Sequence, residues 1–236
     1  MKLSMSTLIR RKNADVVLDE SFGNSWYGCY RTTDESLEAI TSGLALEPRD
    51  SALTIAGCGD QAFALLGKGC KVCVVDNDPR QLKLVARRAS LLRNGDIEEF
   101  LNPFGDSIGE AESPQIKARQ RYFGTAGRLF AVRANLHNLL VNGEPSNIFE
   151  EARRGKYNKI YLSSCFSYGS FSMDFVSRTL QGISRDMPPG LVYISDADKF
   201  DFNAVPYSGF EVDSKQSVKA QILQLRPWMP LVLRKN

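Results

Sequence analysis

The sequence predicts a doubly wound α/β fold, in which a mostly parallel sheet of seven strands ends in a C-terminal antiparallel hairpin. Three observations indicate it. Short apolar runs alternate with amphipathic segments, as strands and helices do in a parallel sheet covered on both faces. Gly57 and Gly59 directly follow the first apolar run, and Asp76 ends the second. Ligands bind such sheets at the carboxyl ends of the strands, where these residues would lie.

The individual elements follow from apolar spacing and from the residues that interrupt it. In chain order we expect helix 35–46, strand 51–56, helix 60–66, strand 70–75, an amphipathic helix through 82–92, strand 128–133, strand 159–163, a helix over 175–187, strand 191–195 and strands 220–225 and 230–233. Residues 96–127 carry several glycines and prolines and are expected to be helical or irregular. Since only a short turn joins the last two strands, they are expected to form the antiparallel hairpin.

Composition and charge exclude several classes of protein. The chain has 236 residues, of which 43% are apolar and 24% charged, as in globular proteins. No apolar run reaches the ~18–20 residues of a membrane span, and the N-terminus lacks a secretory signal. We therefore expect a cytoplasmic protein without a membrane partner. A net charge of +3 without a basic run gives no reason to expect a nucleic-acid partner, and the oligomeric state is not indicated.

The cysteines and the single histidine do not predict a metal site. Cys70 and Cys73 form a CxxC pattern, but they begin a predicted strand, where residues three apart point to opposite faces. A zinc site or a Ser-His-Asp triad would depend on His137 alone. No metal is therefore expected.

The glycines and Asp76 have the spacing of a nucleoside-binding site. Gly57 and Gly59 allow a tight turn and a close approach to a ligand, because they have no Cβ. A carboxylate at the end of the next strand, here Asp76, accepts hydrogen bonds from ribose hydroxyls. Two cofactors fit: a dinucleotide, through Gly57-x-Gly59-x-x-Ala62, and S-adenosylmethionine (SAM). SAM is favoured because about 50 residues precede the glycines, a strand hairpin is expected at the end and no second catalytic domain remains.

Two segments resemble a known family. Ile55–Gln61 and Val75–Gln81 are similar to the strand-end sequences Ile-Ala-Ser-Gly-Gly-Asp-Asn and Val-Asp-x-Asn-Pro-x-Gln of the BtaA-type 3-amino-3-carboxypropyl transferases of betaine-lipid synthesis. The later KYNKIYLSSCFSY resembles the family's segment after the fourth strand, with Ser164 where asparagine is usual. The resemblance implies a class I SAM-methyltransferase-like Rossmann fold over 51–236, and residues 1–50 would form an N-terminal helical arm or lid.

The resemblance also implies a reaction and a set of site residues. The Cγ–S bond of SAM would be cleaved and methylthioadenosine released. The expected SAM-binding residues lie in the two motifs and at neighbouring strand ends: Gly57, Cys58, Gly59, Asp60, Gln61, Asp76, Asn77, Asn135, Ser163 and Ser164. The candidate catalytic residues are Tyr168, Asn135, Ser195 and Tyr30. Tyr168 would present an aromatic face to the sulfonium, Asn135 and Ser195 would orient the amine, and Tyr30 belongs to the segment that could close over the site.

The acceptor is expected to be a small molecule, because no recognition domain or basic face is visible. The smallest nucleophile is the α-amine of SAM itself, which would close a four-membered ring and give azetidine-2-carboxylate. Small azetidine-2-carboxylate synthases of bacterial secondary metabolism are similar to this chain in size and organisation. Three alternatives remain open: 3-amino-3-carboxypropyl transfer to another small nucleophile, an ordinary small-molecule methyltransferase, and a non-catalytic SAM-binding module.

Overall fold

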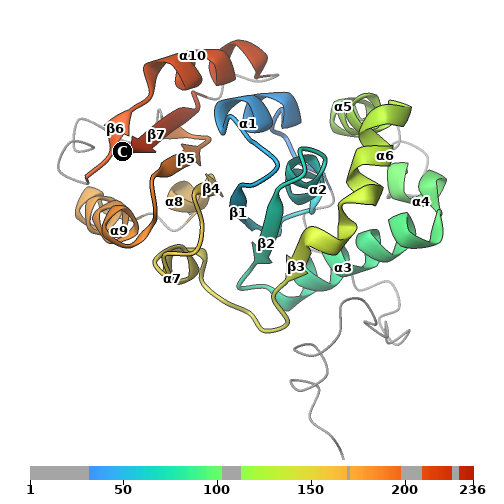
Figure 1. Cartoon of the computed structure of the whole chain (residues 1–236), viewed down its shortest axis with the longest axis horizontal. Helices are drawn as coiled ribbons and strands as arrows, with labels where there is room; N and C mark the ends of the chain where they lie inside the picture. The colour runs from blue at the N-terminus through green and yellow to red at the C-terminus, as the bar shows by residue number, and fades with distance from the viewer. Residues whose placement is uncertain (1–31, 103–112, 169–170, 198–208, 225–228) are drawn as a thin grey trace, which may run out of the picture.

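A computed structural model describes residues 32–102, 113–168, 171–197, 209–224 and 229–236 (Figure 1). Its centre is a seven-stranded sheet in the order β3-β2-β1-β4-β5-β7-β6. The strands are β1 (Ser51–Ile55), β2 (Lys71–Val75), β3 (Leu139–Val141), β4 (Lys159–Ser163), β5 (Gly190–Ile194), β6 (Glu211–Val212) and β7 (Leu231–Lys235). β7 is antiparallel to β5 and β6, and the other neighbouring pairs of described strands are parallel. The predicted doubly wound fold is confirmed.

Helices cover both faces of the sheet. They are α1 (Leu37–Gly43), α2 (Asp60–Leu66), α3 (Pro79–Asn94), α4 (Ile97–Leu101), α5 (Pro114–Phe123), α6 (Ala126–Ala134), α7 (Ile148–Ala152), α8 (Cys165–Tyr168), α9 (Met173–Asp186) and α10 (Ser214–Leu223), with the 3₁₀ turn η2 (Leu136–Asn138) before β3. Residues of α1 to α6 and α10 pack on one face, and residues of α7, α8 and α9 on the other. Figure 1 shows α1 and α10 side by side above the sheet.

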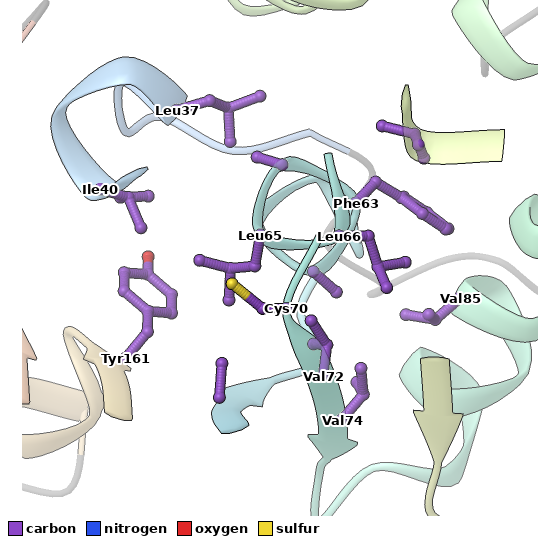
Figure 2. Close-up of a cluster of buried hydrophobic side chains, with 14 of the residues drawn as sticks. Leu37, Ile40, Phe63, Leu65, Leu66, Cys70, Val72, Val74, Val85 and Tyr161 are labelled. Carbon is purple, nitrogen blue, oxygen red and sulfur yellow. The ribbon is translucent and has the colours of Figure 1, made fainter. Parts of the chain in front are cut away.

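Two buried cores result, one on each face. The α2-side core includes Leu65, Leu66, Val72 and Val74, which Figure 2 shows gathered between α2 and β2. The α9-side core is built from residues such as Ile160, Val176, Leu180 and Ile183. Cys70 belongs to the α2-side core and Cys73 to the α9-side core. The prediction that these two cysteines lie on opposite faces of the sheet is confirmed.

Local sequence explains the helix that follows β2. Asp78 is the N-cap of α3, where its side chain accepts a hydrogen bond from the Arg80 backbone N–H at 2.9 Å. Pro79 stands at the first position, whose N–H needs no partner. Gly95 ends the helix at φ 90°, a conformation that favours glycine. The helix therefore begins at Pro79, and Asp76 and Asn77 stay in the short connection at the carboxyl end of β2.

The predicted third strand, 128–133, is wrong. These residues lie in α6, and the third strand is β3 at Leu139–Val141. RLFAVR is a short continuous apolar run between two arginines, and such a run fits a buried strand or a helix. Alanine, leucine and arginine are strong helix formers, and Thr125 precedes the helix as its N-cap. Only Val132 of this helix is buried, and Phe130 is exposed, as expected for a helix that packs on the protein through one narrow face.

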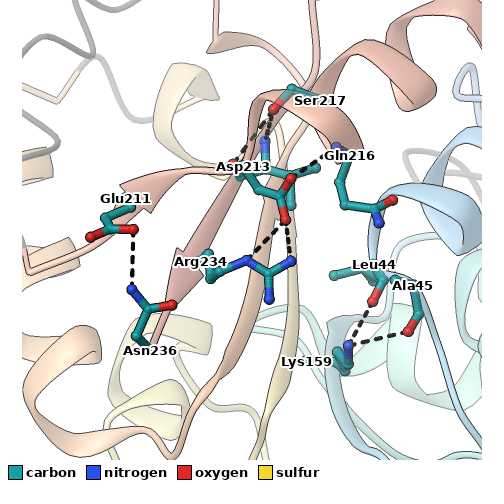
Figure 3. Close-up of polar contacts among 10 residues, drawn as sticks. Leu44, Ala45, Lys159, Glu211, Asp213, Gln216, Ser217, Arg234 and Asn236 are labelled. Atoms are coloured by element: carbon teal, nitrogen blue, oxygen red, sulfur yellow. Dashed lines mark hydrogen bonds and ion pairs between the residues drawn. The ribbon is translucent and has the colours of Figure 1, made fainter.

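The predicted strand 220–225 is also wrong, since α10 covers Ser214–Leu223. Its N-cap Asp213 accepts a hydrogen bond from the Gln216 backbone N–H at 3.0 Å, which is a helix start signal. The same carboxylate accepts from Arg234 Nε of β7 at 3.0 Å (Figure 3). The antiparallel partner of β7 at this end is therefore β6, reached through a helix rather than a tight turn.

Helix α1 is fixed at its C-terminal end by β4. Lys159 Nζ donates to the Leu44 carbonyl oxygen at 2.8 Å and to that of Ala45 at 3.3 Å (Figure 3). Carbonyl groups at the C-terminal end of a helix have no N–H partner within that helix, and they carry partial negative charge. A buried ammonium group can therefore bind them favourably. Lys159 begins β4, so the other end of α1 points toward the carboxyl end of that strand. Glu35 and Ser36 lie at that end of α1.

Candidate functional site at the carboxyl edge of the sheet

The glycine turn after β1 leaves room on one side only. Gly57 has φ +43° and Gly59 φ +86°, both in the left-handed region. A Cβ on Gly57 would meet nothing within 4 Å, whereas a Cβ on Gly59 would meet Val85 Cγ2 at 3.0 Å and Phe63 Cε2 at 3.3 Å. Gly59 therefore allows the turn to pack on α3 and α2. Gly57 is the position at which a ligand can approach the backbone.

Asp76 lies beside this turn at the end of β2. Its Oδ2 accepts a hydrogen bond from the Gly57 N–H at 3.2 Å, and its Oδ1 accepts one from the Asp78 N–H at 2.9 Å. Burial raises the pKa of the Asp76 carboxyl above its usual value, although these two backbone donors lower it. Asn77 is exposed next to it. Gly57 and Asp76 are thus brought together as the sequence predicted.

Three further residues of the predicted SAM set are engaged inside the protein. Asp60 is fully buried and pairs with Arg119 Nε at 2.8 Å and with Arg88 Nη1 at 3.4 Å. The Arg88 guanidinium also donates to the carbonyl of Cys58. Gln61 Nε2 donates to Thr33 Oγ1 at 2.8 Å. These contacts support the glycine turn from the interior, and a direct contact with SAM stays a prediction for Cys58, Asp60 and Gln61.

A carboxylate that the sequence motifs did not identify lies at the ends of β4 and β5. Glu35 Oε1 accepts hydrogen bonds from Tyr161 Oη at 2.6 Å and from Ser163 Oγ at 2.8 Å. Its Oε2 accepts a hydrogen bond from the Ser195 hydroxyl. Figure 2 shows the Tyr161 hydroxyl directed toward α1, and Glu35 directly precedes the N-cap of that helix. One buried carboxylate therefore connects three hydroxyls from two strands.

No sequence signal distinguishes Glu35 from an ordinary surface residue. It precedes a short helix, and acidic residues are common near helix N-termini. Its partners Tyr161 and Ser195 lie 126 and 160 residues away in the chain. Only the fold brings them together.

The backbone of Ser163 is strained where it meets this carboxylate. Ser163 has φ +53°, which is uncommon for a residue with a Cβ. The register between β4 and β5 also shifts between Tyr161 and Ser163. The Ser163 carbonyl still accepts from the Ser195 N–H at 3.1 Å, so the two strand ends stay joined. Strained residues of this kind cluster at functional sites.

Solved structures of three other proteins are similar to this chain. No protein-family model matches the chain, and no curated protein matches it. A proposed sarcosine dimethylglycine methyltransferase from Galdieria sulphuraria is 12% identical with a TM-score of 0.42, over 83% of this chain and 82% of that one. The bifunctional kinase-methyltransferase WbdD is 15% identical with a TM-score of 0.43, over 85% of this chain and 39% of that one. A SAM-dependent methyltransferase from Methanosarcina mazei is 12% identical with a TM-score of 0.37, over 80% and 94%.

Identities of 12–15% with TM-scores of 0.37–0.43 assign no activity to this chain, so an activity has to be argued from the residues of the site itself. No helix within the described ranges is long and apolar enough to cross a membrane. In the same part of the chain, no group of three histidine, cysteine or carboxylate side chains could hold a metal ion.

Asn135 lies away from the other predicted site residues. It ends α6 and precedes β3, so it stands at the amino edge of the sheet, and the premise that it follows the third strand is wrong. Its Nδ2 donates to the Ala131 carbonyl at 2.8 Å, as a helix-ending residue does. The polar residue that follows β3 is Asn142, whose Nδ2 donates to Ser146 Oγ at 2.8 Å. The Ser146 N–H in turn donates to the Asp76 carbonyl at 2.9 Å.

The structure shows the positions of some of the remaining predicted site residues. Ser163 and Ser195 lie at the carboxyl edge, and Ser164 is buried directly after Ser163. Tyr168 ends α8, but its side chain lies outside the described part of the structure. Tyr30 also lies outside the described residues, as does most of the proposed N-terminal arm.

Proposed function

We propose that this chain is a SAM-dependent transferase that binds SAM across the carboxyl ends of β1 and β2. The observation that carries this proposal is the contact of Asp76 with the backbone of Gly57, beside the open space that a Cβ of residue 57 would occupy. A nucleoside with a charged tail fits this arrangement, because its sugar would meet a carboxylate while its tail would pass the Gly57 backbone, where no Cβ is in the way.

Asp76 keeps the capacity to bind ribose. Each carboxylate oxygen has two lone pairs; Oδ2 accepts the Gly57 N–H and Oδ1 accepts the Asp78 N–H, and a backbone contact with Asn77 also lowers the pKa of this carboxyl. The remaining lone pairs would accept the two ribose hydroxyls. These bonds would have a charged acceptor, so each is worth about 1.5–3 kcal/mol.

We further propose that the enzyme cleaves the Cγ–S bond of SAM, with the α-amine of SAM as the nucleophile. The neutral amine would form an N–Cγ bond while the Cγ–S electron pair passes to sulfur. The positive charge would move from sulfur to the ring nitrogen, which then loses a proton to solvent. The products would be azetidine-2-carboxylate and methylthioadenosine. The acidic and hydroxyl-bearing ends of β4 and β5 support a neutral amine nucleophile over an anionic one, because negative charge there repels an anion and the hydroxyl oxygens can accept hydrogen bonds from N–H groups.

The test is the product formed from SAM without any acceptor. We expect methylthioadenosine and azetidine-2-carboxylate in equal amounts, detected by mass spectrometry. Methylthioadenosine that forms only when a small amine or thiol is added would indicate transfer to that acceptor. S-adenosylhomocysteine would indicate a methyltransferase, and saturable binding without any product would indicate a binding module.

A matched control separates binding from chemistry. Asp76→Asn keeps the size of the side chain but removes its charge. We expect this variant to bind SAM about 10-fold or more weakly, in line with the loss of hydrogen bonds to a charged group. Unchanged SAM affinity in a folded Asp76→Asn protein would remove the proposed nucleoside site.

A further inference from the structure

We propose that Glu35 is a positioning residue, which fixes the hydroxyls of Ser163 and Ser195 as hydrogen-bond acceptors for the amino group of bound SAM. This inference rests on the proposed function, since it takes SAM as the ligand of this edge. Glu35 acts through the two serines rather than by touching the reacting atoms.

The number of donors on each hydroxyl leads to this assignment. A serine hydroxyl has one O–H and two lone pairs. Ser163 and Ser195 both direct that O–H to Glu35. Their oxygens can then only accept further hydrogen bonds, so a ligand group beside them has to be a donor. In the amino-acid part of SAM, the amino group has N–H bonds to offer, whereas the carboxylate and the sulfonium have none.

The charges around Glu35 favour the same group. Asp196 directly follows Ser195, is buried, and together with burial raises the pKa of the Glu35 carboxyl. Among the described residues, the side chains of Tyr161, Tyr193 and Cys165 also interact with Glu35, and burial raises their own pKa values, so that they stay neutral at neutral pH. A cationic ligand beside this region lowers the pKa of Glu35 again, since an opposite charge favours the ionised carboxylate.

Glu35 is held in place from both sides along the chain. Before it, Thr33 Oγ1 accepts from the Glu35 N–H at 3.1 Å and from Gln61 Nε2 at 2.8 Å. After it, the Ser36 N–H donates to Gln224 Oε1 at 3.2 Å. The position of the carboxylate is therefore fixed by α2 and α10 as well as by its three hydroxyl partners. Because the carboxylate is fixed, the two serine oxygens that bind it are fixed as well. Fixed acceptors are needed to orient an amine toward Cγ.

The test compares Glu35→Gln with the wild type, using SAM and methylthioadenosine as two ligands. Glutamine has the size of glutamate, but its NH₂ donates, so at least one serine hydroxyl has to turn its O–H toward the ligand. Methylthioadenosine keeps the nucleoside and lacks the amino-acid part. We expect calorimetry to show SAM binding weakened about 10- to 100-fold, the range for hydrogen bonds to a charged group. Methylthioadenosine should bind with its wild-type affinity.

The comparison with Asp76→Asn makes the outcome specific. That variant should weaken both ligands, because both contain ribose. If Glu35→Gln weakens both ligands equally, Glu35 only supports the fold, and the proposal is overturned. If Glu35→Gln leaves SAM affinity unchanged, the amino group does not lie beside the serines, and the proposal is again overturned.

A second background shows whether Glu35 acts through the serines. In a Ser163→Ala/Ser195→Ala protein, the step from glutamate to glutamine should leave SAM affinity unchanged, because the hydroxyls that it reorients are gone. A further loss there would contradict the positioning role. The proposed reaction fails separately: a wild type that binds SAM with the expected Glu35 dependence but releases no methylthioadenosine refutes the chemistry and leaves the Glu35 assignment standing. A wild type that binds neither ligand refutes both.

Discussion

At the scale of single residues, the two glycines of the turn have different functions. Gly57 borders open space and Gly59 borders Val85 and Phe63, although both have positive φ. The sequence pattern does not distinguish the two glycines. It indicates that neither position tolerates a Cβ, but it does not show in which direction that Cβ would point. The side on which a ligand can approach follows only from the packing of α2 and α3 around the turn.

This difference predicts two separable phenotypes. Gly57→Ala should lose SAM affinity and about 1–2 kcal/mol of unfolding free energy, the cost of a left-handed residue with a Cβ. Gly59→Ala should lose more unfolding free energy, because its Cβ would also press on Val85. Urea denaturation and calorimetry on both variants measure the two effects. A Gly57→Ala protein less stable than Gly59→Ala would contradict the placement of the open space.

Glu35 predicts a pH dependence of stability. Burial raises its pKa in the folded protein, so the folded state binds this proton more tightly than the unfolded chain does. The wild type should therefore lose the contribution of this group as the pH rises from its unfolded pKa of about 4.3 through the raised folded value. Glu35→Gln cannot ionise, so its unfolding free energy relative to the wild type should increase with pH. Urea titrations of both proteins at about pH 5 and about pH 8 bracket part of this window. A difference that stays constant between these two pH values would mean that folding does not raise the pKa of Glu35.

Part of the candidate site could be predicted from local sequence, and part could not. Gly57 and Asp76 follow consecutive strands, and Ser163 and Ser195 end apolar runs, so their places at one edge follow from strand order alone. Glu35 could not be found, because a carboxylate before a short helix has no local feature that indicates burial. The sequence places Asn135 at the wrong edge of the sheet, because the segment before it, which forms α6, also fits the pattern of a strand.

At the scale of elements, α2, α3 and α5 meet at a buried ionic group below the turn. The guanidinium carbon of Arg119 lies 4.4 Å from the centre of the Phe100 ring, and its Nε donates to Asp60. Asp60 Oδ2 and the Nη atoms of Arg119 have no hydrogen-bond partner among the contacts of the described residues. A pair with such incomplete bonding contributes little net stability, yet removing one member leaves a buried charge without compensation.

We therefore expect Asp60→Ala to destabilise the protein by about 3–5 kcal/mol. The exposed pair between Asp174 and Arg178 on α9 is the matched control, because both side chains are more than two-thirds exposed. Asp174→Ala should change the unfolding free energy by less than about 1 kcal/mol. Thermal and urea denaturation compare the two. Similar losses in both variants would show that the Asp60 group is hydrated rather than buried.

The two incorrect strands fail for the same reason at this scale. In 128–133 and in 220–225 the apolar residues form short runs of a few positions, and periodicity over so few residues does not separate a strand from a helix. The start signals at Thr125 and Asp213 lie upstream of the pattern and decide the outcome. The elements around the glycine turn were predicted with nearly correct bounds, because each is ended by a glycine, an aspartate or a proline.

At the scale of the whole molecule, Cys70 and Cys73 report on opposite faces of one sheet. Both are buried, and burial raises the pKa of Cys70 to about 12 and that of Cys73 above its usual value. Their thiols should stay unreactive while the protein is folded, because the thiolate is the reactive form.

If both faces unfold as one cooperative unit, the two cysteines should become reactive at the same urea concentration. Labelling with a thiol reagent across a urea series, followed by peptide mass spectrometry, gives a separate curve for each cysteine. Cys58 of the glycine turn, whose carbonyl accepts from Arg88 of α3 and whose pKa is raised by burial to about 12, provides a third curve. Curves with clearly different midpoints would mean that the α2-side and α9-side cores unfold independently.

The hydrogen bonds of Glu35 also set the order in which the protein can mature during synthesis. The carboxylate is made early, but its partners are 126, 128 and 160 residues further along the chain. Tyr161 and Ser163 of β4 become available before Ser195, so the carboxylate gains its last hydroxyl partner only when the end of β5 has left the ribosome. Closing so long a loop is slow compared with local helix formation. The glycine turn and Asp76, only 19 residues apart at their contact, can be complete long before. A nascent chain could thus form the contact between Gly57 and Asp76 early, whereas the full set of Glu35 hydrogen bonds can form only after Ser195 has been made.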